Sequence, residues 1–233
     1  MTEELFREDA YLKSCEAKVI KINDLGGIIL DRTVFYPTGG GQPGDSGKID
    51  DIEIVTTVYD RETGEIVHVP SEGQSLPEEG AVVTASLNWN MRYLHMRMHT
   101  GLHLLCASVP CGVTGGQIGA VKSRLDFDIG EMKLDKEEIT NQLNGYMDGN
   151  HEVTSSWITD AEMDEKPDLV RTMSVKPPRK GGRVRLLKVG DAVDLQPCGG
   201  THVKNTSEIG RLRVSKIENK GKRNRRVNIV FEE

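Results

Sequence analysis

Apolar and polar positions alternate in short runs over the first ninety residues of the chain. These runs are rich in β-branched residues and are separated by turns that contain glycine and asparagine, which is typical of β-strands. We expect no helix in this part. The pattern predicts a small antiparallel β-barrel, whose strands we expect at residues 17–22, 27–30, 52–58, 66–69 and 81–87.

The hydrophobic period becomes helical after Asn88. From residue 91 to 109, apolar residues recur on one face of a helix, and Asn88 or Asn90 is placed to cap its start. A second helix is predicted over 136–147, with Asp135 as its N-cap.

The last fifty residues return to strand patterns. Helices mixed in this way with antiparallel strands indicate an α+β fold. We therefore predict a small N-terminal antiparallel β-barrel domain at residues 1–89, followed by an α+β domain at residues 90–233. The late runs that we expect to be strands, the last pair forming a hairpin across a basic loop, are 183–188, 192–195, 211–217 and 227–231.

Composition is that of an ordinary soluble protein, with 36% hydrophobic residues in a chain of 233. No apolar run is long enough to span a membrane, and the acidic N-terminus has no secretory signal. We therefore expect a cytoplasmic protein that does not meet a membrane, with its cysteines reduced. Cys106 and Cys111 lie in an apolar stretch, and we interpret them as core residues.

Charge is distributed unevenly along the chain. Residues 1–165 carry 13 basic and 29 acidic side chains, whereas residues 166–233 carry 17 basic and 7 acidic ones. Such a split is typical of a protein with one face that meets a polyanion. A solvated surface with clustered charge gives the same count, so charge alone does not decide between the two.

Four residues in two segments have the spacing of metal ligands. His99 and His103 lie four residues apart on the strongest predicted helix, which places both rings on one face. Cys198 and His202 are also four apart, with glycines between them that permit a tight turn. Three imidazoles and one thiolate suit a single tetrahedral zinc ion per chain. His95 extends the helical row by one turn, so any two of the three histidines satisfy the spacing.

The segments His-Thr-Gly-Leu-His at 99–103 and Cys-Gly-Gly-Thr-His at 198–202 resemble the editing domain of alanyl-tRNA synthetases, and above all the freestanding AlaX proteins. The segment Phe-Tyr-Pro-Thr-Gly-Gly-Gly-Gln-Pro-Gly-Asp at 35–45 is similar to the family's glycine-rich segment in the N-terminal barrel. It departs from the family at Gly39, where a serine is common. The threonyl-tRNA synthetase editing domain shares the zinc motif, but the barrel segment and the chain length point to AlaX.

The resemblance implies a zinc-binding editing domain at 90–233 that acts in trans on tRNA(Ala) mischarged with serine or glycine, and so protects the fidelity of translation. No signature for activating ATP or alanine is visible, so aminoacylation is not expected. Thr38 and Gln42, with Gly40 and Gly41, are predicted to contact the amino acid or the ribose, and Thr38 is the natural partner for the serine hydroxyl. The alternative is that they are only turn and strand-edge residues.

Basic residues that follow the second motif are predicted to contact the phosphates of an acceptor stem. Aromatic residues are nearly absent among them, so backbone contact is expected in place of base stacking. The predicted tRNA-binding residues are Lys204, Arg211, Arg213, Lys222, Arg223, Arg225 and Arg226.

Two other functions stay open at this point. One is an RNA-binding module with a purely structural zinc, because four protein ligands fill a tetrahedron. The other is a deacylase for another mischarged tRNA. A metallopeptidase is disfavoured, because Thr100, Gly101 and Leu102 stand where a catalytic glutamate is needed. The sequence does not determine whether zinc is catalytic, whether serine or glycine is preferred, or the oligomeric state, although we expect a monomer.

Overall fold

The computed structural model describes residues 2–173 and 179–232 of the chain. The chain divides into two compact units, Met1–His95 and Met96–Glu233, and the division falls within helix α1 (Trp89–Ser108). The boundary expected from the sequence, between residues 89 and 90, stays a prediction. Among the described residues, no helix is both long and apolar enough to cross a membrane.

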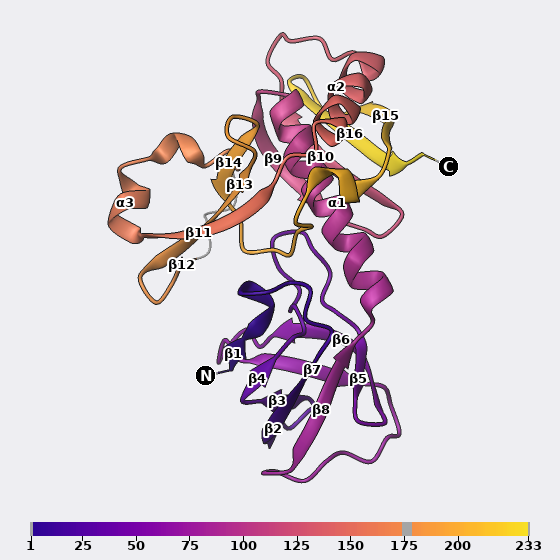
Figure 1. Cartoon of the computed structure of the whole chain (residues 1–233), viewed down its shortest axis with the longest axis vertical. Helices are drawn as coiled ribbons and strands as arrows, with labels where there is room; N and C mark the ends of the chain where they lie inside the picture. The colour runs from indigo at the N-terminus through magenta and orange to yellow at the C-terminus, as the bar shows by residue number, and fades with distance from the viewer. Residues whose placement is uncertain (1, 174–178, 233) are drawn as a thin grey trace. The chain divides into compact units, whose positions relative to one another are not determined.

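Antiparallel strands close the first unit into a barrel in the order β2-β3-β7-β6-β5-β8 (Figure 1). The predicted barrel is thereby confirmed; the sequence missed only β5, which is three residues long. Strands β1 and β4 form a short parallel pair outside the barrel, and a 3-10 turn, Leu5–Arg7, follows β1. The strands are β1 Glu3–Glu4, β2 Ser14–Ile22, β3 Ile28–Leu30, β4 Arg32–Thr33, β5 Gly47–Ile49, β6 Ile52–Tyr59, β7 Ile66–Pro70 and β8 Val82–Leu87.

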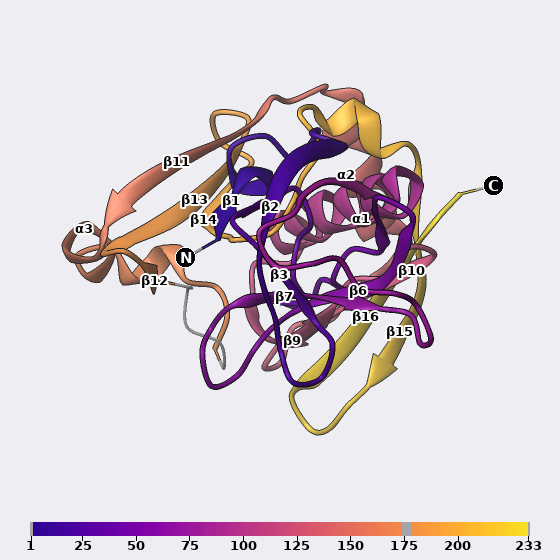
Figure 2. The same cartoon turned by 90° about the horizontal axis from the view of Figure 1, so that it is seen from below.

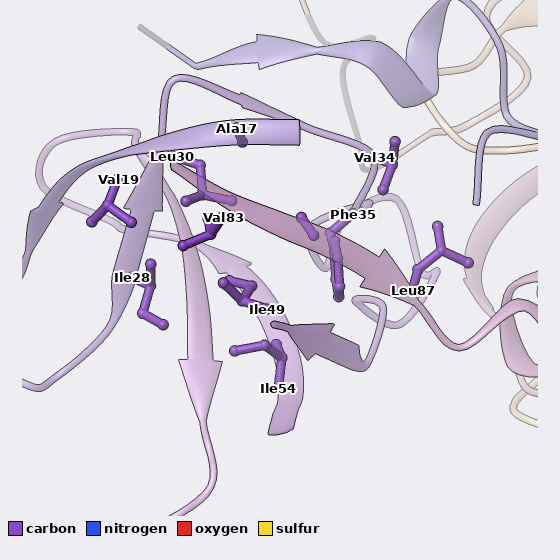
Figure 3. Close-up of a cluster of buried hydrophobic side chains, with 11 residues drawn as sticks. Ala17, Val19, Ile28, Leu30, Val34, Phe35, Ile49, Ile54, Val83 and Leu87 are labelled. Carbon is purple, nitrogen blue, oxygen red and sulfur yellow. The ribbon is translucent and has the colours of Figure 1, made fainter. Parts of the chain in front are cut away.

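The alternation along the strands explains the barrel core. On β8, Val83, Ala85 and Leu87 are buried, whereas Val82 on the opposite side of the strand is exposed. Burial of each large apolar side chain contributes about 1.5–3 kcal/mol to folding. The cluster drawn in Figure 3 consists of Ala17, Val19, Ile28, Leu30, Val34, Phe35, Ile49, Ile54, Val83, Ala85 and Leu87.

Both predicted helices are present, with the expected caps. The side chain of Asn88 accepts a hydrogen bond from the backbone N–H of Met91 (3.3 Å) at the start of α1. The second helix, α2 (Lys136–Asp148), begins after Asp135, whose carboxylate accepts from the N–H groups of residues 137 and 138 (2.9 and 2.8 Å).

The second unit contains an antiparallel sheet in the order β15-β16-β10-β9. Helices α1 and α2 lie over one face of this sheet (Figures 1 and 2). The predicted hairpin formed by β15 and β16 is confirmed, whereas the sequence missed β9 and β10. The strands are β9 Gly112–Gln117, β10 Lys122–Asp128, β15 Leu212–Asn219 and β16 Asn224–Phe231.

A smaller sheet in the same unit has β13 (Arg183–Val189) at its centre. One side of β13 pairs with β11 (Val153–Thr159), and the other pairs with β12 (Arg179–Lys180) and β14 (Asp194–Pro197). The predicted strand at 192–195 is thus present two residues later. Together with helix α3 (Asp160–Asp164) and the 3-10 turns Pro167–Leu169 and Thr206–Ile209, these elements confirm the α+β fold.

A candidate metal centre

Two segments bring four possible metal ligands together in the second unit. His99 and His103 come from α1, while Cys198 and His202 come from the loop that follows β14. One ligand atom from each residue lies within 4.8 Å of the others, and all four residues are buried. The cysteine Sγ is 3.5 Å from Nε2 of His99 and 3.2 Å from Nε2 of His202. Among the described residues this cluster does not include His95.

The outer nitrogen of His202 is held by the hydroxyl of Thr100. Thr100 Oγ1 lies 3.2 Å from Nδ1 of His202 and donates its own proton to the carbonyl of Met96 (2.9 Å). Because a hydroxyl has a single proton, Thr100 must accept from the imidazole Nδ1–H. The nitrogen that faces Cys198, Nε2, is therefore the unprotonated one, as metal binding requires.

The outer nitrogen of His103 is held by a buried carboxylate. Oδ2 of Asp194 accepts from Nδ1 of His103 (2.8 Å) and from Nε2 of Gln196 (2.7 Å). The guanidinium of Arg171 lies 4.0 Å from the other carboxylate oxygen. Asp194, Gln196 and Thr100 are functional candidates that the spacing argument missed. For Asp194 and Gln196 the available signal was the alternation Asp-x-Gln-x-Cys at 194–198, which places both side chains on the same face of a strand as Cys198.

Burial and charge shift the pKa values within the cluster. Burial opposes ionisation of Cys198, but the nearby His99 and His202 outweigh it and hold its pKa well below the ordinary value. Burial alone would lower the pKa of His103, yet Asp194 and the cysteine raise it to about 10. The pKa of His202 is held well below its ordinary value by burial and by His99.

The raised pKa of His103 reflects two buried acidic groups beside it, Cys198 and Asp194. A divalent cation would neutralise both, and three imidazoles with a thiolate are donors that suit zinc. The residues therefore fit one metal ion. That they bind zinc stays a prediction.

The glycine-rich segment of the first unit forms a tight turn. Gly39 and Gln42 exchange two backbone hydrogen bonds (3.1 and 2.9 Å). Between them, Gly40 and Gly41 have φ values of 56° and 81°. Positive φ at both central positions is the signature of a type I′ turn, which glycine adopts without strain.

Thr38 connects this turn to strand β6. Its hydroxyl donates to the carbonyl of Thr57 (3.3 Å) and accepts from the N–H of Gly44 (2.9 Å). The Thr38 residue is exposed, and its hydroxyl keeps one acceptor lone pair, whereas Gln42 is fully buried. The substrate contacts of both residues stay predictions.

A buried ion pair that the sequence did not reveal fastens the end of the segment. Nε of Arg92 lies 3.1 and 3.0 Å from the two carboxylate oxygens of Asp45, which also accepts from the N–H of Tyr36 (2.6 Å). The same guanidinium donates to the carbonyls of Val34 (2.6 Å) and Ala10 (2.9 Å). Because all three nitrogens of Arg92 donate hydrogen bonds, the start of α1 is tied to the glycine-rich segment.

Comparison with known proteins supports the resemblance. A family model described as the threonyl and alanyl tRNA synthetase second additional domain matches residues 184–228, and one described as tRNA synthetases class II (A) matches residues 8–91. The alanyl-tRNA editing protein AlaX-M of Methanosarcina acetivorans is 36% identical over 97% of this chain and 98% of its own length. This chain belongs to the AlaX family. The AlaX-M protein of Pyrococcus horikoshii is 35% identical over 100% of the chain and 99% of its own length.

Other relatives place this AlaX chain within longer proteins. The AlaX-L protein of Pyrococcus horikoshii is 34% identical, and the match covers 95% of the chain but 56% of the relative. The alanine–tRNA ligase of Pyrobaculum arsenaticum is 36% identical over 93% of the chain and 25% of its own length. The chain thus corresponds to the whole of AlaX-M and to a quarter of the ligase.

Six of the seven basic residues predicted to contact tRNA lie in this AlaX chain on β15, β16 or directly beside them, whereas Lys204 lies ahead of the 3-10 turn Thr206–Ile209. Lys204, Arg211, Arg213, Lys222 and Arg223 are exposed, and Arg225 and Arg226 are partly buried. Acidic residues from earlier in the chain offset part of their charge. The ion pairs are Arg211 with Asp148 (3.0 Å), Arg223 with Asp128 (3.0 Å) and Arg226 with Asp126 (2.7 Å).

Proposed function

We propose that this chain is an editing hydrolase that cleaves the ester between a wrong amino acid and tRNA(Ala), with serine as the principal substrate and glycine as the second. The observation that carries the proposal is the buried cluster of His99, His103, Cys198 and His202 in a chain that matches alanyl-tRNA editing proteins over their whole length. Mischarged tRNA is then the partner, and the cytoplasm is the proposed place of action.

The proposed cofactor is one zinc ion per chain. When bound, zinc would polarise the ester carbonyl or orient the ester for attack by water. The protein's own contribution is to hold His103 and His202 in one tautomer through Asp194 and Thr100. Cys198, His103 and Asp194 are the residue types of a Cys–His–carboxylate arrangement, but a thiolate that binds zinc is not free to form an acyl intermediate, so we favour direct attack by water.

Recognition of the amino acid is assigned to the glycine-rich turn. Thr38 keeps one acceptor lone pair, which is suited to the hydroxyl of a seryl group. Alanine lacks that hydroxyl and would leave the acceptor unsatisfied, which is the basis of strong discrimination. Gln42, Gly40 and Gly41 are proposed to contact the same amino acid or the ribose.

The basic residues are proposed to contact phosphates of the acceptor stem. Lys222 and Arg213 are exposed and are the strongest candidates, since Arg211, Arg223 and Arg226 already form ion pairs. Contacts of this kind give an affinity that falls as salt rises.

A deacylation assay tests the proposal. Seryl, glycyl and alanyl esters of tRNA(Ala) are incubated with the zinc-loaded protein, and the remaining ester is measured over time. Seryl-tRNA(Ala) is expected to be hydrolysed fastest and alanyl-tRNA(Ala) slowest. Absence of ester loss at micromolar enzyme refutes the proposal.

The four-residue donor set favours one rival, an RNA-binding module whose zinc is structural, because four ligands leave no open tetrahedral position. That rival is supported if the protein binds tRNA tightly without any ester loss. A deacylase for another tRNA is the second rival, since the matching family model covers threonyl as well as alanyl synthetases. Seryl-tRNA(Thr) in the same assay separates it from the proposal.

A further inference from the structure

The small sheet of the second unit connects the metal cluster to an exposed strand. Arg185 on β13 pairs directly with Trp157 on β11. On its other side, the carbonyl of Arg185 accepts from the N–H of Cys198 (3.0 Å), the residue that follows β14. Directly opposed residues of antiparallel strands point to the same face. Trp157, Arg185 and Cys198 therefore form one row across three strands, on one face of the sheet.

This face is the one that carries the cluster. Asp194 and Gln196 precede Cys198 at intervals of two along β14, so they share its face. Asp194 accepts a hydrogen bond from His103 and another from Gln196. Strands lie about 4.8 Å apart, so the backbone of Trp157 is about 10 Å from that of Cys198. This is a span comparable to that of one nucleoside.

On the face that carries Trp157, Leu187 and Val189 of β13 are buried, and a second hydrophobic cluster packs on the opposite face. Val184 and Leu186 of β13 are buried there against Met163 of α3, with Ile158 of β11 packed beside them. The indole of Trp157 points away from that cluster and is 44% exposed. A single exposed apolar residue is ordinary in itself. The placement of this one, in line with a metal ligand, is what indicates a role.

Arg185, which lies between Trp157 and Cys198 in this row, fixes the loop that carries Cys198. Its Nη1 donates to the carbonyls of Cys198 (3.1 Å) and Gly200 (3.1 Å), and the side chain is buried. The loop that carries the metal-binding cysteine is thus fixed to the strand that pairs with β11. A group stacked on Trp157 would keep a constant distance from the cluster.

We propose that Trp157 is a stacking platform for the nucleobase of the nucleoside whose ribose carries the ester at the metal cluster. The inference rests on the proposed function, and it adds a contact to the RNA that the basic residues do not make. The ligand class is a single unpaired base at an RNA 3′ end. Stacking on an aromatic ring suits such a base because it needs no particular hydrogen-bonding pattern.

Steady-state deacylation of seryl-tRNA(Ala) tests the platform. Trp157→Ala is expected to raise KM by about 5- to 100-fold with the zinc content unchanged, whereas Trp157→Phe, which keeps a ring, stays within about threefold of wild type. The matched control is Leu195→Ala, at a residue of the same sheet that is 41% exposed but lies on the opposite face. It is expected to change nothing. A KM for Trp157→Ala equal to that of the control overturns the inference.

A binding measurement keeps the test decisive if Trp157→Ala does not fold. The chain has two tryptophans, Trp157 and Trp89, so 5-fluorotryptophan labelling gives two fluorine resonances, which Trp157→Phe assigns. The probe is 3′-deoxyadenosine bearing a 3′-seryl amide, which cannot be hydrolysed. The Trp157 resonance is expected to shift on titration, and an unmoved resonance at saturation overturns the inference.

The two proposals fail in different ways. If the wild-type protein releases no serine from seryl-tRNA(Ala), the proposed function is wrong. If the wild type is active but neither KM nor the fluorine resonance responds at Trp157, only the platform is wrong. Capture of a protein partner on β11 without any response to the nucleoside probe also counts against it.

Discussion

Asp194→Asn removes the negative charge behind His103 while keeping the size of the side chain and one acceptor oxygen. In the wild type the carboxylate accepts from His103 at 2.8 Å and from Gln196 at 2.7 Å, and its side chain is fully buried. Loss of an outer partner of this kind lowers metal affinity by about 10- to 100-fold. We therefore expect the Kd for zinc to rise by that factor, which corresponds to about 1.4–2.7 kcal/mol.

Competition with a chromophoric chelator of known zinc affinity measures the change, and the visible absorption of the Co²⁺-loaded protein reports the ligand geometry. Asp191→Asn is the matched control, because Asp191 lies three residues earlier, is fully exposed and forms an ion pair with Lys188 at the surface. The control is expected to bind zinc as the wild type does. A Kd for Asp194→Asn within twofold of the control, in a folded protein, would refute the role given to this carboxylate.

Three further changes test other parts of the account. Arg92→Met leaves the carboxylate of Asp45 buried without its cationic partner, because both side chains are almost fully buried. Calorimetry should show the first unit destabilised by about 3–5 kcal/mol. A loss of stability below about 1 kcal/mol speaks against the ion pair. Burial lowers the pKa of His68 from 6.5 to about 4, so the unfolded chain binds more protons than the folded barrel between these values. The barrel should thus be most stable above pH 6.5 and lose on the order of 3 kcal/mol as the pH falls to 4, which urea titrations of wild type and His68→Gln will check; equal pH slopes contradict it. Lys222→Ala should reduce the salt slope of tRNA binding by about one unit, and Arg226→Ala by less, since its charge is already offset by an ion pair; the reverse order contradicts this.

The first unit was largely readable from the sequence, because its strands alternate and its core is made of β-branched residues. Helix α1 was readable for the same kind of reason, a 3.6-residue period with Asn88 at its start. In contrast, β9 escaped notice because glycines at 112, 115 and 116 leave it few apolar residues, and β10 because its buried face consists of Ser123, Leu125 and Phe127 among charged residues. Strand β11 is exposed over most of its length, so its Thr-Ser-Ser sequence shows no alternation. The capping box of Thr159 and Glu162 at the start of α3 was a usable signal that went unused.

The four residues of the cluster were found by spacing because each pair lies within one turn of a helix or loop. The residues that hydrogen-bond to these ligands were not found, because the contact of Asp194 with His103 spans 91 residues and depends on the pairing of β14 with β13. Sequence spacing carries no information on such a contact. The register also explains why Trp157 lies in line with Cys198, although 40 residues separate them in the chain.

The charge count along the chain overstated the positive surface. Strand β16 carries several of the basic residues, but it pairs with β10, which contributes Asp126 and Asp128 from the acidic part of the chain. The asymmetry of the sequence is therefore partly cancelled within one sheet. Lys222, an exposed lysine of the β15–β16 loop, is therefore a better candidate for a phosphate contact than the arginines on the strands.

Hydrolysis of the ester is expected to require metal bound at the cluster of His99, His103, Cys198 and His202. Single-turnover deacylation of seryl-tRNA(Ala) should be measured while a chelator sets the zinc content from zero to one ion per chain, with Cys198→Ala in parallel. The expected result is a rate that rises in proportion to bound zinc, together with a Cys198→Ala protein that neither holds zinc nor releases serine. Hydrolysis at the full wild-type rate by protein with no bound metal would contradict the account.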